Sequence, residues 1–173
     1  MGWYVLQCRP GQEQSTIQSC AQHLSEYALE SAFNFRCERL WRVDGVWKTM
    51  EKDMFPGYVF LQSSHPGTLS KELDEYRGIV KVMEDNGYLI SLYDDEELFL
   101  RRLCGEEHYL KMSYGYIDRE KGTACITEGP LKEIQSQIIK LDWHKRFAQV
   151  EIPLLRQKSV VWAGLGIARE LVS

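Results

Sequence analysis

The chain has 173 residues, of which 44% are apolar and 27% charged, and its net charge at pH 7 is −4. This composition is typical of a soluble globular protein with one domain or two small ones. No apolar run approaches the roughly 20 residues that span a bilayer, and the first residues lack the pattern of a secretory signal. We therefore expect a cytoplasmic protein without a membrane partner.

Charge is distributed unevenly along the chain. Up to Glu120 there are 13 Lys and Arg against 20 Asp and Glu, a net charge of −7, whereas from Lys121 onward 8 stand against 5, a net charge of +3. Such an asymmetry favours a protein with two different partners. Two merely solvated surfaces would give the same counts.

The five cysteines are odd in number and widely spaced, without C-x-x-C or zinc-ligand spacing. We expect reduced structural thiols, and neither a metal nor a cofactor. The residues are Cys8, Cys20, Cys37, Cys104 and Cys125.

The first half of the chain predicts an α+β domain. Residues 3–8 predict a strand and residues 12–32 a helix, because apolar residues in the latter recur at three- and four-residue spacing. An extended segment over 33–43 and a returning strand over 46–50 are joined by Asp44-Gly45, a strong hairpin signal.

A strand that is apolar on both faces follows Pro56-Gly57, as expected at the centre of a sheet. A short helix around Leu69, strands over 79–83 and 88–92, and a helix over 94–103 complete the pattern. This order predicts a ferredoxin-like α+β layout, with two helices on one face of an antiparallel sheet.

Residues 104–121 are loop-prone and predict a tether that docks in part. The residues after them predict a small all-β domain. Its candidate strands cover 123–127, 137–141, 147–152, 159–163 and 166–171.

Catalytic motifs are missing from the sequence. It has no phosphate-binding loop, no G-x-S-x-G elbow and no H-E-x-x-H, and its four histidines are scattered. A small hydrolase would need a site that the sequence does not show, so we expect a binding protein and no enzyme.

Three segments resemble the NusG family of transcription elongation factors. Residues 53–62, which contain Phe55-Pro56-Gly57-Tyr58, are similar to a signature of the domain that binds RNA polymerase. Residues 2–7 resemble the family's opening strand, and residues 80–83 resemble a later one. Among the subgroups, the chain most resembles the RNA-guided antiterminators called LoaP.

The resemblance implies a ferredoxin-like N-terminal domain of the NGN type over 1–107 and a linker over 108–121. It implies an SH3-like β-barrel of the KOW type over 122–173.

The KOW motif itself is altered in this chain. Residues 128–131 and 139–142 resemble it, but Ser136 stands where the motif has glycine, and Arg156-Gln157-Lys158 stands where it has a Gly-Arg pair. These departures weaken an inherited contact with Rho or with a ribosomal protein, the usual partners of the KOW domain.

A polymerase-binding surface also follows from the resemblance. In the family, the residues that match Phe55 and Tyr58 lie in a hydrophobic cavity that takes the clamp helices of the polymerase's largest subunit. If the strand that begins at Trp3 is a neighbour of the strand at Phe55 and Tyr58, Trp3 would join these two residues around a shallow apolar pocket. The alternative is that all three pack the protein's own core.

A basic surface is the second candidate site. Cations in loops at one end of a small barrel suit phosphates and guanine edges, and LoaP-type factors recognise an RNA hairpin in a leader transcript. A solvated surface is the alternative. The set is Lys132, Lys140, His144, Lys145, Arg146, Arg156 and Lys158.

We therefore expect a monomeric transcription antitermination factor that bridges RNA polymerase and an RNA hairpin. The tip of the first hairpin, with Trp47 and Lys48, is expected near upstream or non-template DNA, unless it is only solvated. The alternative function is that of a general NusG factor whose KOW domain binds Rho or the ribosome.

Overall fold

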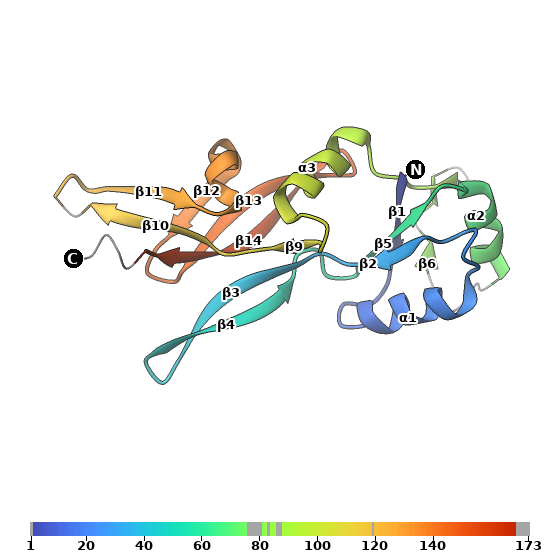
Figure 1. Ribbon diagram of the computed structural model, residues 1–173, viewed down its shortest axis with the longest axis horizontal. Coiled ribbons are helices and arrows are strands. Elements are labelled where there is room, and N and C mark those ends of the chain that lie inside the picture. Colours follow the sequence, from blue (N-terminus) through green and yellow to red (C-terminus); the bar gives the residue numbers. More distant parts are fainter. Residues whose placement is uncertain (1, 76–80, 83, 86–87, 119, 169–173) are drawn as a thin grey trace. The chain divides into compact units, whose positions relative to one another are not determined.

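The computed structural model describes residues 2–75, 81–82, 84–85, 88–118 and 120–168 (Figure 1). The chain forms two compact units. Unit 1 comprises Met1–Asn34 and Phe55–Leu98, and unit 2 comprises Phe35–Met54 and Phe99–Ser173. Unit 2 therefore combines a hairpin from the first third of the chain with the C-terminal residues. The domain limits at 107 and 122 stay a prediction.

Unit 1 is an α+β structure, as predicted. Its main sheet has the strand order β2-β5-β1-β6, and β1 is antiparallel to both of its neighbours. Its elements are β1 (Gly2–Gln7), α1 (Glu13–His23), β2 (Ser31–Phe33), β5 (Tyr58–Ser63), α2 (Pro66–Glu75), β6 (Lys81–Val82), β7 (Glu84–Asp85) and β8 (Tyr88–Leu89). Helix α3 (Asp94–Cys104) begins in unit 1 and ends in unit 2.

The two faces of the main sheet bury different side chains. On one face, Leu6, Val59 and Leu61 belong to a cluster with Cys20 of α1, with Leu24 just after that helix, and with Leu69 and Leu73 of α2. On the other face, Trp3, Val5, Phe33 and Phe60 are buried. The apolar residues on both faces of β5 thus indicated a central strand correctly, since β5 pairs with β1 and β2.

Two predicted elements of unit 1 differ from the structure or lie partly outside the residues that it describes. Helix α1 ends at His23 and not at residue 32, because the backbone turns extended at Leu24 (φ −93°, ψ 143°). Residues 31–33 instead form β2, which pairs with β5 and buries Phe33. Of the strand predicted over 79–83, including the family-like segment 80–83, only Lys81 and Val82 are described, as β6.

Unit 2 is rich in β-structure, also as predicted. One sheet has the order β4-β3-β9 and the other β11-β10-β14-β13-β12. The elements are β3 (Arg36–Val43), β4 (Val46–Asp53), β9 (Tyr109–Leu110), β10 (Ser113–Asp118), β11 (Thr123–Glu128), the 3-10 helix η1 (Pro130–Gln137), β12 (Ile138–Asp142), β13 (Phe147–Leu154) and β14 (Gln157–Ile167).

The loop-prone stretch 104–121 contains more structure than its composition indicated. Strand β9 pairs with β3 and strand β10 pairs with both β11 and β14, while Leu110 and Met112 are buried. Long-range pairing has therefore overridden the weak local preference for strand.

A single strand, β14, replaces the two strands predicted over 159–163 and 166–171, whose last residues, 169–171, lie outside the described part of the chain. Gly164 does not interrupt it but permits a close approach. A Cβ atom there would lie 2.2 Å from Met112 Sδ and 2.3 Å from the Glu38 carbonyl oxygen. The backbone of β3 therefore packs directly against β14.

The five cysteines are free thiols. Burial raises the pKa of Cys20 and Cys37 to about 11 and that of Cys104 to about 12. An unfolded chain releases these protons from roughly pH 8.5 upward, whereas the folded chain retains them. The folding free energy that these thiols contribute is thus fully present below that pH and is lost as the pH rises toward the folded values.

We predict that the native protein is alkylated at Cys125, which is exposed, well before Cys37 and Cys104. The thiolate is the reactive form, and burial keeps the two inner thiols protonated. Peptide mass spectrometry after timed iodoacetamide treatment at pH 8 measures the order. In denaturant all three should react alike; equal rates in the native protein would contradict the burial of Cys37 and Cys104.

Candidate functional sites

The turn at Pro56-Gly57 is held by a buried carboxylate. Glu13, which is 3% exposed, accepts the backbone N–H of Gly57 at 2.8 Å on Oε1 and that of Gly11 at 2.9 Å on Oε2. The Cys8 N–H donates to the Gly57 carbonyl oxygen at 2.8 Å. Gly57 itself has a φ of +85°, and a Cβ there would lie 2.9 Å from the Cys8 carbonyl oxygen. Only glycine fits this turn without strain.

A row of aromatic rings runs across the buried face of the sheet in unit 1. The Trp3 and Phe33 ring centroids are 5.1 Å apart, those of Phe33 and Phe60 are 5.9 Å apart, and those of Phe60 and Phe55 are 6.1 Å apart. Offset and edge contacts at these distances stabilise a core beyond the area that they bury. Phe55, although it precedes β5, is therefore part of this packing.

The structure does not bring Trp3 together with Tyr58. Strands β1 and β5 are antiparallel, so Trp3 lies opposite Gln62 while Tyr58 lies opposite Gln7. Four residues along a strand separate them by about 13 Å. Trp3 is fully buried and its Nε1–H donates to Gln62 Oε1 at 3.4 Å, so the expected pocket rimmed by all three aromatics does not form.

Tyr58 is the most exposed member of that set. Phe55 is 5% exposed, whereas Tyr58 is half-buried and its N–H donates to the Phe55 carbonyl oxygen at 3.1 Å. Sequence reasoning identified the turn but could not separate the core ring from the surface ring, because burial depends on the pairing of β5 with β1.

The basic residues fall into separate groups in unit 2. His144, Lys145 and Arg146 lie in the turn between β12 and β13, whereas Arg156 lies in the turn between β13 and β14. Strand β13 lies between the two turns, and its eight residues span roughly 23 Å. Lys132 is in η1, Lys140 is in β12, and Lys158 is the second residue of β14, where its Nζ lies 3.6 Å from Glu151 Oε2.

Residues of the β3–β4 hairpin approach the first of these groups. The Arg146 guanidinium carbon lies 5.3 Å from the centre of the Trp47 ring, and that of Arg42 lies 5.8 Å from the same centre. Burial, and then the charge of Arg42, lowers the pKa of Arg146. The sequence marked Trp47 as part of a hairpin tip, but nothing in it indicated a contact with residues a hundred positions away.

A second set of cation–π contacts lies beside the first. Lys140 Nζ is 5.8 Å from the centre of the Phe147 ring, and the Arg39 guanidinium carbon is 6.0 Å from it. Arg39 also lies 5.5 Å from the centre of the Trp162 ring, which stacks on Phe147. Both hairpin and C-terminal strands therefore contribute cations to one aromatic surface.

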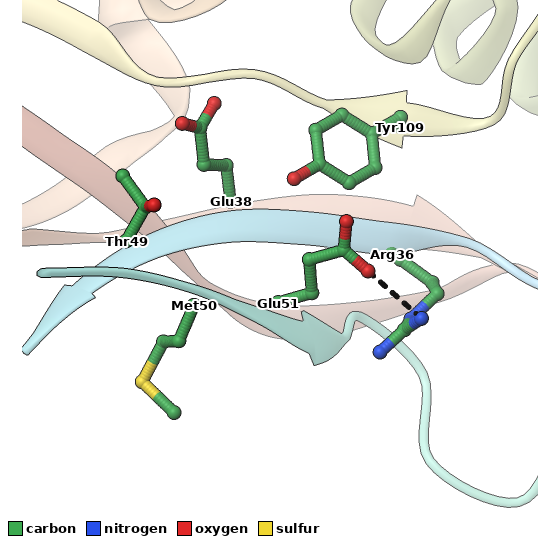
Figure 2. Close-up of a pocket in the computed structure, with 6 residues that line it drawn as sticks. All are labelled: Arg36, Glu38, Thr49, Met50, Glu51 and Tyr109. Atoms are coloured by element: carbon green, nitrogen blue, oxygen red, sulfur yellow. Dashed lines mark ion pairs between the residues drawn. The ribbon is translucent and has the colours of Figure 1, made fainter.

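A shallow cavity of about 480 Å³ lies on the β3–β4–β9 sheet (Figure 2). Its Arg36 side chain is already paired, since Arg36 Nη1 lies 2.9 Å from Glu51 Oε2 and Arg36 Nε lies 3.6 Å from Asp53 Oδ1. Burial, together with Glu51 and Glu38, raises the pKa of Tyr109, which keeps its hydroxyl protonated. Arg36, the cation that lines this cavity, is thus already engaged by carboxylates of the protein and does not favour an anionic ligand.

Two further features of the described residues limit the classes of site. Across them, no helix is long and apolar enough to cross a membrane. Nor do His, Cys, Asp and Glu side chains gather there in groups that could hold a metal ion.

Comparison with known proteins identifies the class as transcription factors. A family model described as "Transcription termination factor nusG" matches residues 1–98, more than half of the chain. The chain therefore belongs to the NusG family, whose members are non-enzymatic and generally bind RNA polymerase. No curated protein matches.

A solved structure that concerns domain interaction in NusG of Thermotoga maritima is also similar to this chain. The identity is 15% and the TM-score 0.48, over 94% of this chain and 93% of that one. The family assignment rests on the family model and not on this likeness.

We predict that Glu13→Ala lowers the free energy of unfolding by about 2–4 kcal/mol, because it leaves the buried Gly57 N–H without an acceptor and removes a charge from the start of α1. Urea unfolding measures the change. The matched control is Glu26→Ala at an exposed position after the helix. Equal small losses in both variants would show that the carboxylate does not hold the turn.

Proposed function

We propose that this member of the NusG family is a processive antitermination factor of the LoaP subgroup. It binds RNA polymerase through its N-terminal part and an RNA hairpin of a leader transcript through its C-terminal part. The observation that carries the proposal is the cationic turn between β12 and β13. In a chain of net charge −4, His144, Lys145 and Arg146 follow one another there, beside Arg42 of the hairpin.

The proposed domains are an NGN-like, ferredoxin-like domain over 1–107, a linker over 108–121 and a KOW-like, SH3-like barrel over 122–173. The five-stranded sheet of unit 2 supports the last of these, as does the turn at Gly129-Pro130. Gly129 has a φ of +96°, and the Leu131 N–H donates to the buried Ser113 Oγ at 3.0 Å. The turn that resembles the KOW motif is thus fixed against β10.

The proposed polymerase site is the surface at the Pro56-Gly57 turn. Tyr58 would contact the clamp helices of the largest subunit, Phe55 would fix the turn from beneath, and Trp3 would support both through the aromatic row. A factor bound there would hold the clamp closed and suppress pausing. The β3–β4 hairpin would lie near upstream or non-template DNA, and the factor would act as a monomer.

We predict that Tyr58→Ala weakens binding to purified RNA polymerase by about 1–3 kcal/mol, as expected for an aromatic interface anchor. Biolayer interferometry with immobilised polymerase measures the affinity. Phe55 is too deeply buried for this test, because its truncation would cost about 3–5 kcal/mol of stability.

Tyr27→Ala is the matched control, since Tyr27 is also a tyrosine and is exposed. Its ring stacks on His65, which follows the end of β5, whereas Tyr58 is at the start of β5. It should leave polymerase binding unchanged. The site is wrong if the Tyr58 variant unfolds, or if it stays folded and binds polymerase as tightly as the control.

We predict that replacing both Lys145 and Arg146 with Ala reduces the salt dependence of binding to a leader RNA hairpin. Each lost phosphate contact lowers the slope of log affinity against log salt by about 0.9 for a duplex, and by less for a single strand. A salt titration followed by fluorescence anisotropy measures the slope. If either residue reads a base, the loss should fall on the cognate hairpin and spare a scrambled one.

The control is the Arg156→Ala, Lys158→Ala pair at the other end of β13, where Arg156 lies in the turn and Lys158 near the start of β14. It shows whether that group contributes independently. Equal weak binding of cognate and scrambled hairpins, unchanged in the Lys145, Arg146 variant, would remove the RNA-reading role and favour a general NusG factor.

A further inference from the structure

Cations and aromatic rings of unit 2 form two clusters, linked by the consecutive residues Arg146 and Phe147, which we together call the cation–aromatic patch. It draws on β3, β4, β12, β13 and β14 and on the turn between β12 and β13. Its members are Arg39, Arg42, Trp47, Lys140, Arg146, Phe147 and Trp162.

At the centre of the patch, two aromatic rings are stacked. The centroids of Phe147 and Trp162 are 4.3 Å apart and their planes differ by 12°. Phe147 is buried, but 44% of the Trp162 surface is exposed. The indole is thus held flat by the ring beneath it and still presents a large aromatic surface to solvent.

The cations around these rings lack acidic partners. Within the part of the chain that the structure describes, no ion pair involves Arg39, Arg42, Lys140 or Arg146. Asp142, which lies opposite Phe147 in the sheet register, accepts the Lys145 N–H on Oδ1 at 2.8 Å. Arg39 Nε and Arg146 Nε are buried without a hydrogen-bond partner.

Placing like charges beside one another is unfavourable, and burial, followed by the charge of Arg42, lowers the pKa of Arg146. The chain has 25 Asp and Glu against 21 Lys and Arg, so acidic side chains that could neutralise these cations are present in the sequence. A polyanion laid across the patch would neutralise these cations, and the exposed indole would meet whatever planar group the polyanion carries.

We propose that the cation–aromatic patch binds an unpaired segment of RNA, with a base stacked on Trp162 and the adjoining phosphates held by Arg39 and Lys140. The ligand is unpaired because bases within a duplex already stack on one another and cannot offer a face to an indole. This inference rests on the proposed function, to which it adds a second contact besides the hairpin stem.

The test is the binding of a fluorescein-labelled oligouridylate to the full chain, with fluorescence anisotropy as the readout. Trp162→Ala should weaken binding roughly 5- to 100-fold, the range for loss of one base–aromatic stack. Trp162→Phe, which preserves a ring over Phe147, should lose less. Trp41→Ala is the matched control, since Trp41 is 50% exposed on β3 but is outside the patch.

The phosphate contacts are tested by salt titration of the same complex. Arg39→Gln should lower the slope of log affinity against log salt by about 0.7, the value for one phosphate of a single strand. Lys71→Gln, an exposed cation of α2 in unit 1, should leave the slope unchanged. Equal slopes for the two variants would overturn the role of Arg39.

Photo-crosslinking of the unaltered protein guards against variants that fail to fold. An oligonucleotide that contains 4-thiouridine should cross-link to the peptide with Trp162, as identified by mass spectrometry. Cross-links confined to other peptides would overturn the proposal. Tighter binding of the matching DNA oligonucleotide would overturn RNA as the ligand.

The outcomes separate this inference from the proposed function. If the leader hairpin binds but the oligouridylate does not, the patch is overturned and hairpin recognition stands. If the oligouridylate binds through Trp162 but the hairpin is not distinguished from its scrambled form, the patch is supported and the proposed hairpin recognition fails.

Discussion

The close packing of β3 against β14 is the constraint on which the arrangement of unit 2 depends. Gly164 leaves room for the Glu38 carbonyl oxygen and the Met112 side chain where any Cβ atom would collide with them. Beside this contact, Cys37 Sγ lies 3.5 Å from the Trp162 carbonyl oxygen. Because the strands lie this close, Arg39 of β3 and Trp162 of β14 come within cation–π distance.

The constraint has an electrostatic consequence. Hairpin cations at Arg39 and Arg42 are brought beside Lys140 and Arg146, which belong to a segment with net positive charge. A single surface lysine or arginine changes the free energy of folding little. These four cations have no carboxylate partners among the described residues, however, and they repel one another. Aromatic faces offset part of that repulsion, since each ring presents negative quadrupole density to the cation above it.

Sequence patterns predicted the strands of both units better than they predicted the surfaces. The Asp44-Gly45 turn and the apolar run after Gly57 are local signals, and both produced the expected hairpin and central strand. The strands β9 and β10 were missed, because their residues are loop-prone and only pairing with β3, β11 and β14 makes them strands. Helix α1 was predicted too long for the same reason, since β2 is selected by its pairing with β5.

Site residues were predictable where one segment supplies them and not where several do. The Pro56-Gly57 turn was found from its own sequence, but Glu13, whose carboxylate holds it, lies 44 positions from Gly57 and no local pattern links the two. Trp3 was grouped with Tyr58 because each begins a strand, and the antiparallel register places them at opposite ends. The basic residues were taken as one set, although β13 separates two of their groups.

On the proposed function, the size of the cation–aromatic patch sets the kind of binding to expect. Four cations that met four phosphates of a single strand would give a salt slope of only about 3, which is small beside that of dedicated nucleic-acid binding proteins. The acidic remainder of the chain would weaken contacts elsewhere along an RNA. Free RNA would therefore be held weakly, whereas a transcript emerging from the polymerase that carries the factor would be present at a high effective concentration. A patch of this size would act on the transcript of its own polymerase and leave other RNA unbound.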